Sequence, residues 1–201
     1  MSFKKKGYVF IKKAISKELA NFINRYLLIK MQAARTMQET RYIMPGAEEW
    51  GIFGDKQVPG AYAAYGDCAT DSLLERLQST IEKHTKLQLY PTYSYTRIYF
   101  KGNILHKHTD RFSCEVSATL FMGGDDWPIY LEKNNKTIKI KFKPGDMLLY
   151  KGGDLPHWRD SFEGQQCSQV FLHYNTADNK FNKFDGRPHL GLPPWFKSHE
   201  T

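Results

Sequence analysis

Residues 105–110 read Leu-His-Lys-His-Thr-Asp, and Pro156-His157-Trp158-Arg159 follows far downstream, with His157 placed 47 residues after Asp110. His108, Asp110 and His157 can together occupy one face of an octahedral metal ion and leave three positions open. If residues 108–110 form a strand, His108 and Asp110 point to the same side of it. The spacing therefore predicts a 2-His-1-carboxylate centre for Fe(II), Mn(II) or Co(II) on a barrel-like scaffold. His106 is the main rival of His108, but it lacks a carboxylate two residues later.

The sequence around this motif has a pattern typical of an antiparallel sheet. Short runs of β-branched and aromatic residues alternate with turns rich in Gly, Asp and Asn. Many short strands joined in this way are typical of a β-sandwich or a double-sheet jelly roll. The strands that the pattern predicts are 87–90, 93–100, 114–122, 127–133, 137–142, 147–150 and 169–174.

The first part of the chain predicts a helical cover for this sheet. After a strand at 8–15, Ser16 is a candidate N-cap for a helix that runs to about Met37. Asp71 is a candidate N-cap for a second helix to about His84, and the intervening residues 45–66 read as a loop. We expect a mainly β fold with helical cover (α+β), in which the N-terminal helices pack on one sheet. One domain would span 1–201, with cover 1–86, jelly-roll core 87–175 and tail 176–201.

Composition narrows the class of protein. A hydrophobic fraction of 41% with 14% aromatic residues indicates a packed globule, and no apolar run is long enough for a membrane helix. We expect a soluble, cytoplasmic protein. Cys68, Cys114 and Cys167 are few and far apart, which favours reduced thiols. The net charge of +8 could attract nucleic acid, but no Arg-rich tract or base-stacking motif accompanies it, so solvated lysines are the favoured interpretation.

Residues 88–175 resemble the Fe(II)/2-oxoglutarate-dependent dioxygenases, and most closely their prolyl-hydroxylase branch. The spacing of Tyr99, Gly102 and His108 matches that branch, as does a Pro-Gly-Asp turn at 144–146 before an apolar strand and the distal His157. The chain is also similar to phage-encoded members of this group. The resemblance implies a double-stranded β-helix, a cupin-like variant of the jelly roll. It also implies Fe(II), 2-oxoglutarate and O2 as cofactor and co-substrates.

The activity that the resemblance implies is hydroxylation of an unactivated C–H bond with release of succinate and CO2. A peptidyl or free amino acid is the expected substrate, with proline the leading choice, so the expected partner is a peptide or a small molecule. A nucleic-acid demethylase of the same superfamily is a less favoured alternative, because its two arginines after the distal histidine have no counterpart between residues 165 and 180. A non-redox cupin-like barrel that binds a metal or a ligand is a further alternative.

The chain departs from the prolyl-hydroxylase pattern where the far carboxylate of 2-oxoglutarate should bind. That branch has a Lys or Arg about ten residues after the distal histidine, whereas residues 165–169 read Gln-Gln-Cys-Ser-Gln here. Arg159 is the candidate replacement, since two residues after His157 it would point inward with it and grip a carboxylate by two hydrogen bonds. An ion pair of Arg159 with Asp160, Glu163 or Asp110 is an equally open reading.

Other residues are candidates for the walls of the site. The Tyr99 hydroxyl could donate a hydrogen bond to 2-oxoglutarate. Ser117 and Thr119 share one face of a predicted strand and could line the same pocket. Arg97 and Arg111 flank the metal motif and could meet a substrate, or could be ion-paired residues at its rim. Trp127 is a candidate wall residue, and His173 could lie inside the barrel or behind the ligands. Residues 45–66 and 175–198 are the expected substrate loops.

Overall fold

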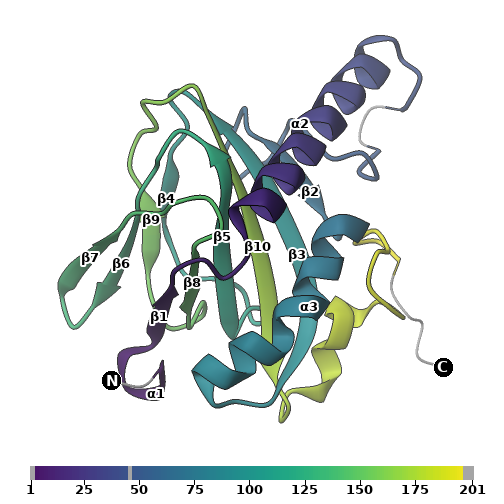
Figure 1. The fold of residues 1–201 in the computed structure, drawn as a ribbon. Helices are drawn as coiled ribbons and strands as arrows, with labels where there is room; N and C mark the ends of the chain where they lie inside the picture. Colours follow the sequence, from purple (N-terminus) through teal and green to yellow (C-terminus); the bar gives the residue numbers. More distant parts are fainter. Residues whose placement is uncertain (1–2, 45–46, 197–201) are drawn as a thin grey trace.

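In the computed structural model, which describes residues 3–44 and 47–196, two antiparallel sheets face each other (Figure 1). The six-stranded sheet has the order β1-β8-β5-β10-β3-β2, and the four-stranded sheet has the order β4-β9-β6-β7. The strands are β1 Tyr8–Ile11, β2 Tyr62–Tyr65, β3 Leu89–Phe100, β4 Leu105–His108, β5 Val116–Gly124, β6 Ile129–Lys133, β7 Lys136–Ile140, β8 Met147–Tyr150, β9 His157–Arg159 and β10 Gln166–Thr176. The helices are α1 Phe3–Lys6, α2 Lys17–Glu39, α3 Cys68–Thr85 and the 3-10 helix η1 Lys180–Gly186.

The two long helices begin at side-chain caps. Ser16 caps α2, since its hydroxyl accepts a hydrogen bond from the backbone N–H of Leu19 at 3.1 Å. Helix α3 begins before the predicted Asp71, because Asp67 is the cap and accepts from the N–H of Ala69 at 2.9 Å. Asp71 instead lies buried in the first turn, where it accepts two hydrogen bonds from Ser94 of β3.

Apolar packing separates the molecule into two layers. Both long helices cover the outer face of the six-stranded sheet, where their buried residues meet alternate residues of the strands, such as Leu120 and Leu172. The intervening residues, such as Phe121 and Phe171, point between the two sheets into a second cluster. No helix in the described parts of the chain has the length and apolar character that a bilayer span requires.

The predicted class, mainly β with an N-terminal helical cover, is confirmed, and the differences are local. The predicted strands 87–90 and 93–100 form one strand, β3, which runs through Pro91 at a register shift opposite His173 and Tyr174. The predicted strand 8–15 stops at Ile11. The predicted loop 45–66 contains β2, and an isolated bridge joins Ile52 to Ala63. Residues 45–46 of that loop and 197–201 of the predicted tail lie outside the described residues.

Candidate metal centre

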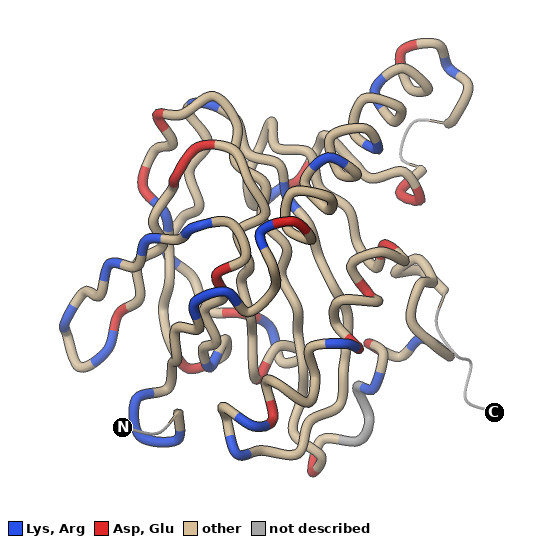
Figure 2. Tube along the Cα trace, viewed as in Figure 1, with Lys and Arg blue, Asp and Glu red and all other residues tan. Residues whose placement is uncertain are grey.

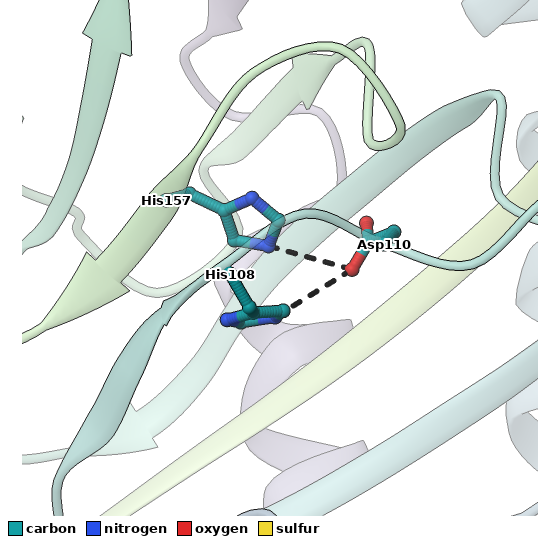
Figure 3. A group of neighbouring side chains, drawn as sticks. All are labelled: His108, Asp110 and His157. Atoms are coloured by element: carbon teal, nitrogen blue, oxygen red, sulfur yellow. Dashed lines mark ion pairs between the residues drawn. The ribbon is translucent and has the colours of Figure 1, made fainter.

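Three side chains meet between the two sheets at the ends of β4 and β9 (Figure 3). His108 ends β4 and pairs across the ladder with His157, which begins β9, so that their ring centroids are 4.3 Å apart. The Oδ1 atom of Asp110 lies 3.7 Å from Nε2 of His108 and 3.4 Å from Nε2 of His157. One ligand atom from each residue lies within 4.8 Å of the others, so a single ion can contact all three.

The chain positions Asp110 differently from what the sequence predicts. Strand β4 ends at His108, and Asp110 lies in the loop beyond it rather than on the same strand. Its backbone N–H donates to the carbonyl of Gly152 at 2.9 Å, and the hydroxyl of Ser117 donates to its Oδ2 at 2.6 Å. Because Oδ2 is engaged by Ser117, Oδ1 is the oxygen that faces the two imidazoles.

Backbone carbonyls fix the orientation of both imidazoles. Nδ1 of His108 is 2.7 Å from the carbonyl oxygen of His106, and Nδ1 of His157 is 2.9 Å from that of Leu155. A carbonyl can only accept, so Nδ1 carries the hydrogen in each ring. Nε2 is then the unprotonated nitrogen, and in both residues it points toward Asp110, as metal coordination requires.

The protonation states also suit a cation. Burial and the neighbouring His157 lower the pKa of His108, which keeps that ring neutral. Burial alone would raise the pKa of Asp110, but its contact with the His157 ring and the hydrogen bond from Ser117 hold it well below its usual range. A neutral imidazole and an ionised carboxylate are the forms that bind metal ions.

A cavity of about 340 Å³ opens in front of the three residues, and both predicted arginines lie in its wall. The Arg97 guanidinium contacts the carboxylate of Asp55 at 2.6 Å. Arg111 contacts Asp185 at 2.8 Å and lies over the ring of Tyr93 at 4.5 Å. Both arginines are therefore ion-paired within the wall. The partner Asp55 could not be found from sequence, because it comes from the loop 45–66, whose path had no readable pattern.

Arg159 and Tyr99 are buried between the two sheets and do not belong to the lining of this cavity. The guanidinium of Arg159 is fully buried, lies 5.1 Å from the Trp127 ring, and donates from Nη1 to the Trp127 carbonyl. Its Nε and Nη2 atoms and the Tyr99 hydroxyl have no hydrogen-bond partner within the described residues. Arg159 forms no ion pair with the described acidic residues, including the three that the sequence offered. Three unpaired polar atoms deep in a protein are costly unless something binds them.

Cys167 occupies the place on β10 where the resemblance would put a lysine or arginine. It pairs in register with Tyr99 and is fully buried. Burial raises the pKa of its thiol, and the positive charge of Arg159 opposes this rise. Arg159 pairs in register with Leu105, which lines the metal-side cavity. Residues 165–169 contain no cation, but Arg159 on β9 of the four-stranded sheet lies close enough to Cys167 for its charge to act on the thiol.

The other residues predicted to line the site differ in whether they contact the three candidate ligands. Trp127 packs beside Arg159 and against Tyr99, whose ring centroid is 4.8 Å from its own, and does not line the cavity beside the metal group. Ser117 contacts Asp110, whereas the Thr119 hydroxyl donates to Oε1 of Gln169 at 3.2 Å. Trp127 and Thr119 are therefore interior residues without contact to the three candidate ligands.

His173 is an interior residue whose role the sequence left open. Its Nδ1 lies 3.0 Å from the hydroxyl oxygen of Ser117, and its ring packs on Tyr93 at 4.6 Å. Because the Ser117 hydroxyl donates to Asp110, Nδ1 of His173 must be the donor in the contact with Ser117. A chain of hydrogen bonds from His173 through Ser117 thus holds the carboxylate of Asp110.

The buried His173 should make the stability of the metal-free protein depend on pH. Burial lowers the pKa of His173 from 6.5 to about 4. Between these values the unfolded chain takes up a proton that the folded protein excludes, so the free energy of unfolding falls as the pH drops through this window. The full loss is about 3.5 kcal/mol at about 1.4 kcal/mol per pKa unit. Urea unfolding at pH 7 and pH 4.5 should show a smaller difference for His173→Gln than for the wild type, and equal differences would contradict this assignment.

Gly152 is a functional position that sequence reasoning missed. A Cβ at this glycine would lie 2.4 Å from Oδ2 of Asp110 and 2.5 Å from the Ser117 hydroxyl. Gly152→Ala should therefore displace the carboxylate and weaken Co(II) binding by about 10- to 100-fold, the usual cost of disturbing a group that holds a metal ligand. Isothermal titration with Co(II) measures this effect. Gly153→Ala is the matched control, since no atom lies within 4 Å of its added Cβ; equal affinities of the two variants would contradict the prediction.

Comparison with known proteins supports the fold alone. No protein-family profile and no curated protein sequence matches this chain. Among solved structures, a prolyl-4-hydroxylase from Pseudomonas putida superposes with a TM-score of 0.64 at 15% identity, over 87% of this chain and 95% of that one. The viral collagen prolyl hydroxylase of Paramecium Bursaria Chlorella virus-1 gives 0.61 at 10% identity, over 87% and 98%. HygX from Streptomyces hygroscopicus, solved with nickel and 2-oxoglutarate bound, gives 0.58 at 12%, over 87% and 85%. The two sheets described above therefore form a double-stranded β-helix, as predicted.

Proposed function

We propose that this protein is an Fe(II)- and 2-oxoglutarate-dependent oxygenase that hydroxylates an unactivated C–H bond and releases succinate and CO2. The observation that carries the proposal is the group His108, Asp110 and His157, with its ligand atoms within 4.8 Å of one another beside a cavity of about 340 Å³. The donor set is the one that non-haem Fe(II) oxygenases use to leave positions open for exogenous ligands.

The residues around the group support each part of this role. His108 and His157 present unprotonated Nε2 atoms, and Asp110 supplies the negative charge that Ser117 and His173 hold in place. A ferrous ion bound there would activate O2 and couple decarboxylation of 2-oxoglutarate to hydroxylation of the substrate. The protein contributes the position of the C–H bond and the exclusion of bulk water.

Arg159 and Tyr99 would bind the far carboxylate of 2-oxoglutarate. Three of their donor atoms are buried and unpaired, and a carboxylate offers acceptors for all of them. Both side chains are fully buried between the sheets, where a charged partner would be shielded from solvent. Ser117 would act through Asp110 rather than on the co-substrate, and Thr119 through Gln169.

The substrate that we propose is a peptidyl or free amino acid, with proline the first choice. The fold shared with two prolyl hydroxylases supports this choice. The cavity wall beside the metal group is rich in tyrosines and also holds Arg111, whose side chain is 46% exposed and can approach a substrate carboxylate or a peptide carbonyl.

The test has two stages. Anaerobic titration of the Fe(II)-loaded protein with 2-oxoglutarate should give a weak visible charge-transfer band, and its absence would favour a non-redox cupin-like barrel. Succinate release is then measured against panels of peptides, amino acids and methylated oligonucleotides. Stimulation by prolyl peptides or amino acids supports the proposal, whereas stimulation by oligonucleotides alone would replace it with the demethylase alternative.

A further inference from the structure

Tyr150 is a cavity residue to which the proposed function gives no role. It ends β8 and pairs in register with Ser117 of β5, the residue that holds Asp110. Its side chain points between the sheets, is only 2% exposed, and lines the cavity in front of the three candidate ligands. Its ring meets the His157 ring edge to face, with the centroids 4.7 Å apart. A buried phenol therefore lies directly beside one of the candidate ligands.

The Tyr150 hydroxyl has one hydrogen-bond partner in the described part of the chain. Its oxygen lies 3.5 Å from Nε2 of His157, at the long limit for a hydrogen bond. Nδ1 of His157 carries the hydrogen of that ring, which it donates to the Leu155 carbonyl at 2.9 Å. Nε2 can therefore only accept, and the hydroxyl is the donor. The phenol thus occupies the lone pair that a metal ion bound by His157 would need.

Metal binding would leave this hydroxyl buried without a partner. An imidazole nitrogen has a single lone pair, so Nε2 cannot accept from Tyr150 and coordinate an ion at the same time. Strand β8, its neighbours β1 and β5, and the strand β9 that carries His157 contain no acidic residue (Figure 2). Of the Asp110 oxygens, Oδ2 accepts from Ser117 and Oδ1 faces the imidazoles. Because a buried hydroxyl without an acceptor is costly, an acceptor from outside the chain would be stabilised there.

We propose that Tyr150 donates a hydrogen bond to a carboxylate that binds at the open positions of the metal. A metal-bound carboxylate keeps free lone pairs on its oxygens and can accept from a neighbouring donor. A metal-bound water is a poor acceptor, because its oxygen gives a lone pair to the ion and its hydrogens point outward. The hydroxyl would therefore exchange one partner for another, leaving Nε2 of His157 for the carboxylate when the metal and its ligand are bound.

The inference rests on the proposed function for the presence of the metal, and it adds a donor for the part of the co-substrate nearest the ion. Arg159 and Tyr99 are proposed to bind the far carboxylate of 2-oxoglutarate, and neither lines the cavity in front of the candidate ligands. Tyr150 lines that cavity and also belongs to the same buried cluster as Tyr99. The carboxylate next to the 2-oxo group is therefore the part of 2-oxoglutarate that Tyr150 would hold.

A packing role explains the position of the Tyr150 ring but not its hydroxyl. Leu148, two residues earlier on the same face of β8, fills the same cluster with an apolar side chain. A phenylalanine at position 150 would pack against His157 without burying a polar atom whose partner is lost to the metal. Buried tyrosine hydroxyls usually have a hydrogen-bond partner, so the oxygen atom is the feature that needs a ligand.

Oxalate and imidazole, as ligands of the Co(II)-loaded protein, test the proposal. Oxalate chelates a metal ion through both of its carboxylates, so none is left for Arg159, whereas imidazole binds through nitrogen and offers no acceptor. Tyr150→Phe should weaken oxalate binding by about tenfold or more, the loss expected for one hydrogen bond to a charged group, and leave imidazole binding unchanged. Co(II) itself should bind Tyr150→Phe at least as tightly as the wild type, because the ion no longer displaces the hydroxyl. The visible spectrum of Co(II) follows each titration without turnover.

The control is Tyr174→Phe, which removes another buried hydroxyl, one that donates to the Leu74 carbonyl at 2.6 Å in the cluster beneath the helices. It should leave the affinities for Co(II), oxalate and imidazole unchanged. If Tyr150→Phe does not fold, as judged by thermal unfolding, Tyr150→Met takes its place, since it also lacks the hydroxyl and should show the same selective loss of oxalate.

The outcomes separate this inference from the proposed function. Equal oxalate affinity in the Tyr150 variant and the wild type, or equal losses for oxalate and imidazole, would overturn the inference and leave the proposed function standing. A clear loss of Co(II) affinity in the Tyr150 variant would mean that the phenol serves the metal ligands rather than the carboxylate, and would also overturn it. Failure of the wild type to bind Co(II) would overturn both.

Discussion

Asp110→Ala is expected to abolish stoichiometric binding of Fe(II) and Co(II) at this site and to remove succinate formation. The carboxylate is the only anionic group among the three candidate ligands, and its Oδ1 atom faces both Nε2 atoms. Disturbing a residue that merely holds a ligand costs about 10- to 100-fold in metal affinity, so loss of the ligand itself should cost more than about 100-fold. Isothermal titration with Co(II) under anaerobic conditions measures the affinity directly, without reference to turnover.

Two variants show whether such a loss is specific. Asp154→Ala removes an exposed carboxylate three residues before His157. The ion pair that Asp154 forms with Lys151 lies outside the site. It should leave Co(II) affinity unchanged. Ser117→Ala frees Oδ2 of Asp110 and should produce an intermediate loss. Wild-type affinity in Asp110→Ala would mean that the metal binds elsewhere, and the proposed function would then lose its foundation.

The clustering of His108, Asp110 and His157 could be predicted from sequence because the three residues belong to short local patterns. His108 and His157 end up paired across β4 and β9, as a barrel of antiparallel strands requires. The reason given for Asp110 was wrong, since it lies in a loop and is placed by the Gly152 carbonyl and Ser117. Residue spacing predicts neither contact, because each depends on the fold bringing a distant segment of the chain next to Asp110. Gly152 could have been suspected only from the Gly-Gly pair at 152–153 that precedes His157.

The residues that complete the cavity wall could not be predicted from the sequence, for the same reason. Asp55, which pairs with Arg97, and Asp185, which pairs with Arg111, lie 42 and 74 residues from their partners. The stacked pair of Tyr130 and Trp158 shows the same limit. Tyr130 and Trp158 are unremarkable in the sequence, and only the register of β6 and β9 brings them together.

Arg159→Met is expected to weaken 2-oxoglutarate binding by roughly a hundredfold while making the protein without 2-oxoglutarate no less stable. Hydrogen bonds to a charged partner contribute about 1.5–3 kcal/mol each, and two of the donor atoms of Arg159 are unpaired without it. Replacing a buried, incompletely paired cation with an apolar side chain of similar size is often neutral or stabilising. Titration of the charge-transfer band gives the affinity, and thermal unfolding with and without 2-oxoglutarate gives the stability.

Cys167→Lys in the Arg159→Met background should restore much of the lost affinity, because it returns a cation to the same end of the barrel from β10, where Cys167 pairs with Tyr99. Cys167→Lys alone should instead destabilise the protein, since it would bury a second positive charge beside Arg159. These opposite responses separate a ligand-binding role from a structural one. If Arg159→Met unfolds more readily and binds 2-oxoglutarate normally, the guanidinium serves only the packing of Trp127 and Phe142, and the far carboxylate must be held by another group.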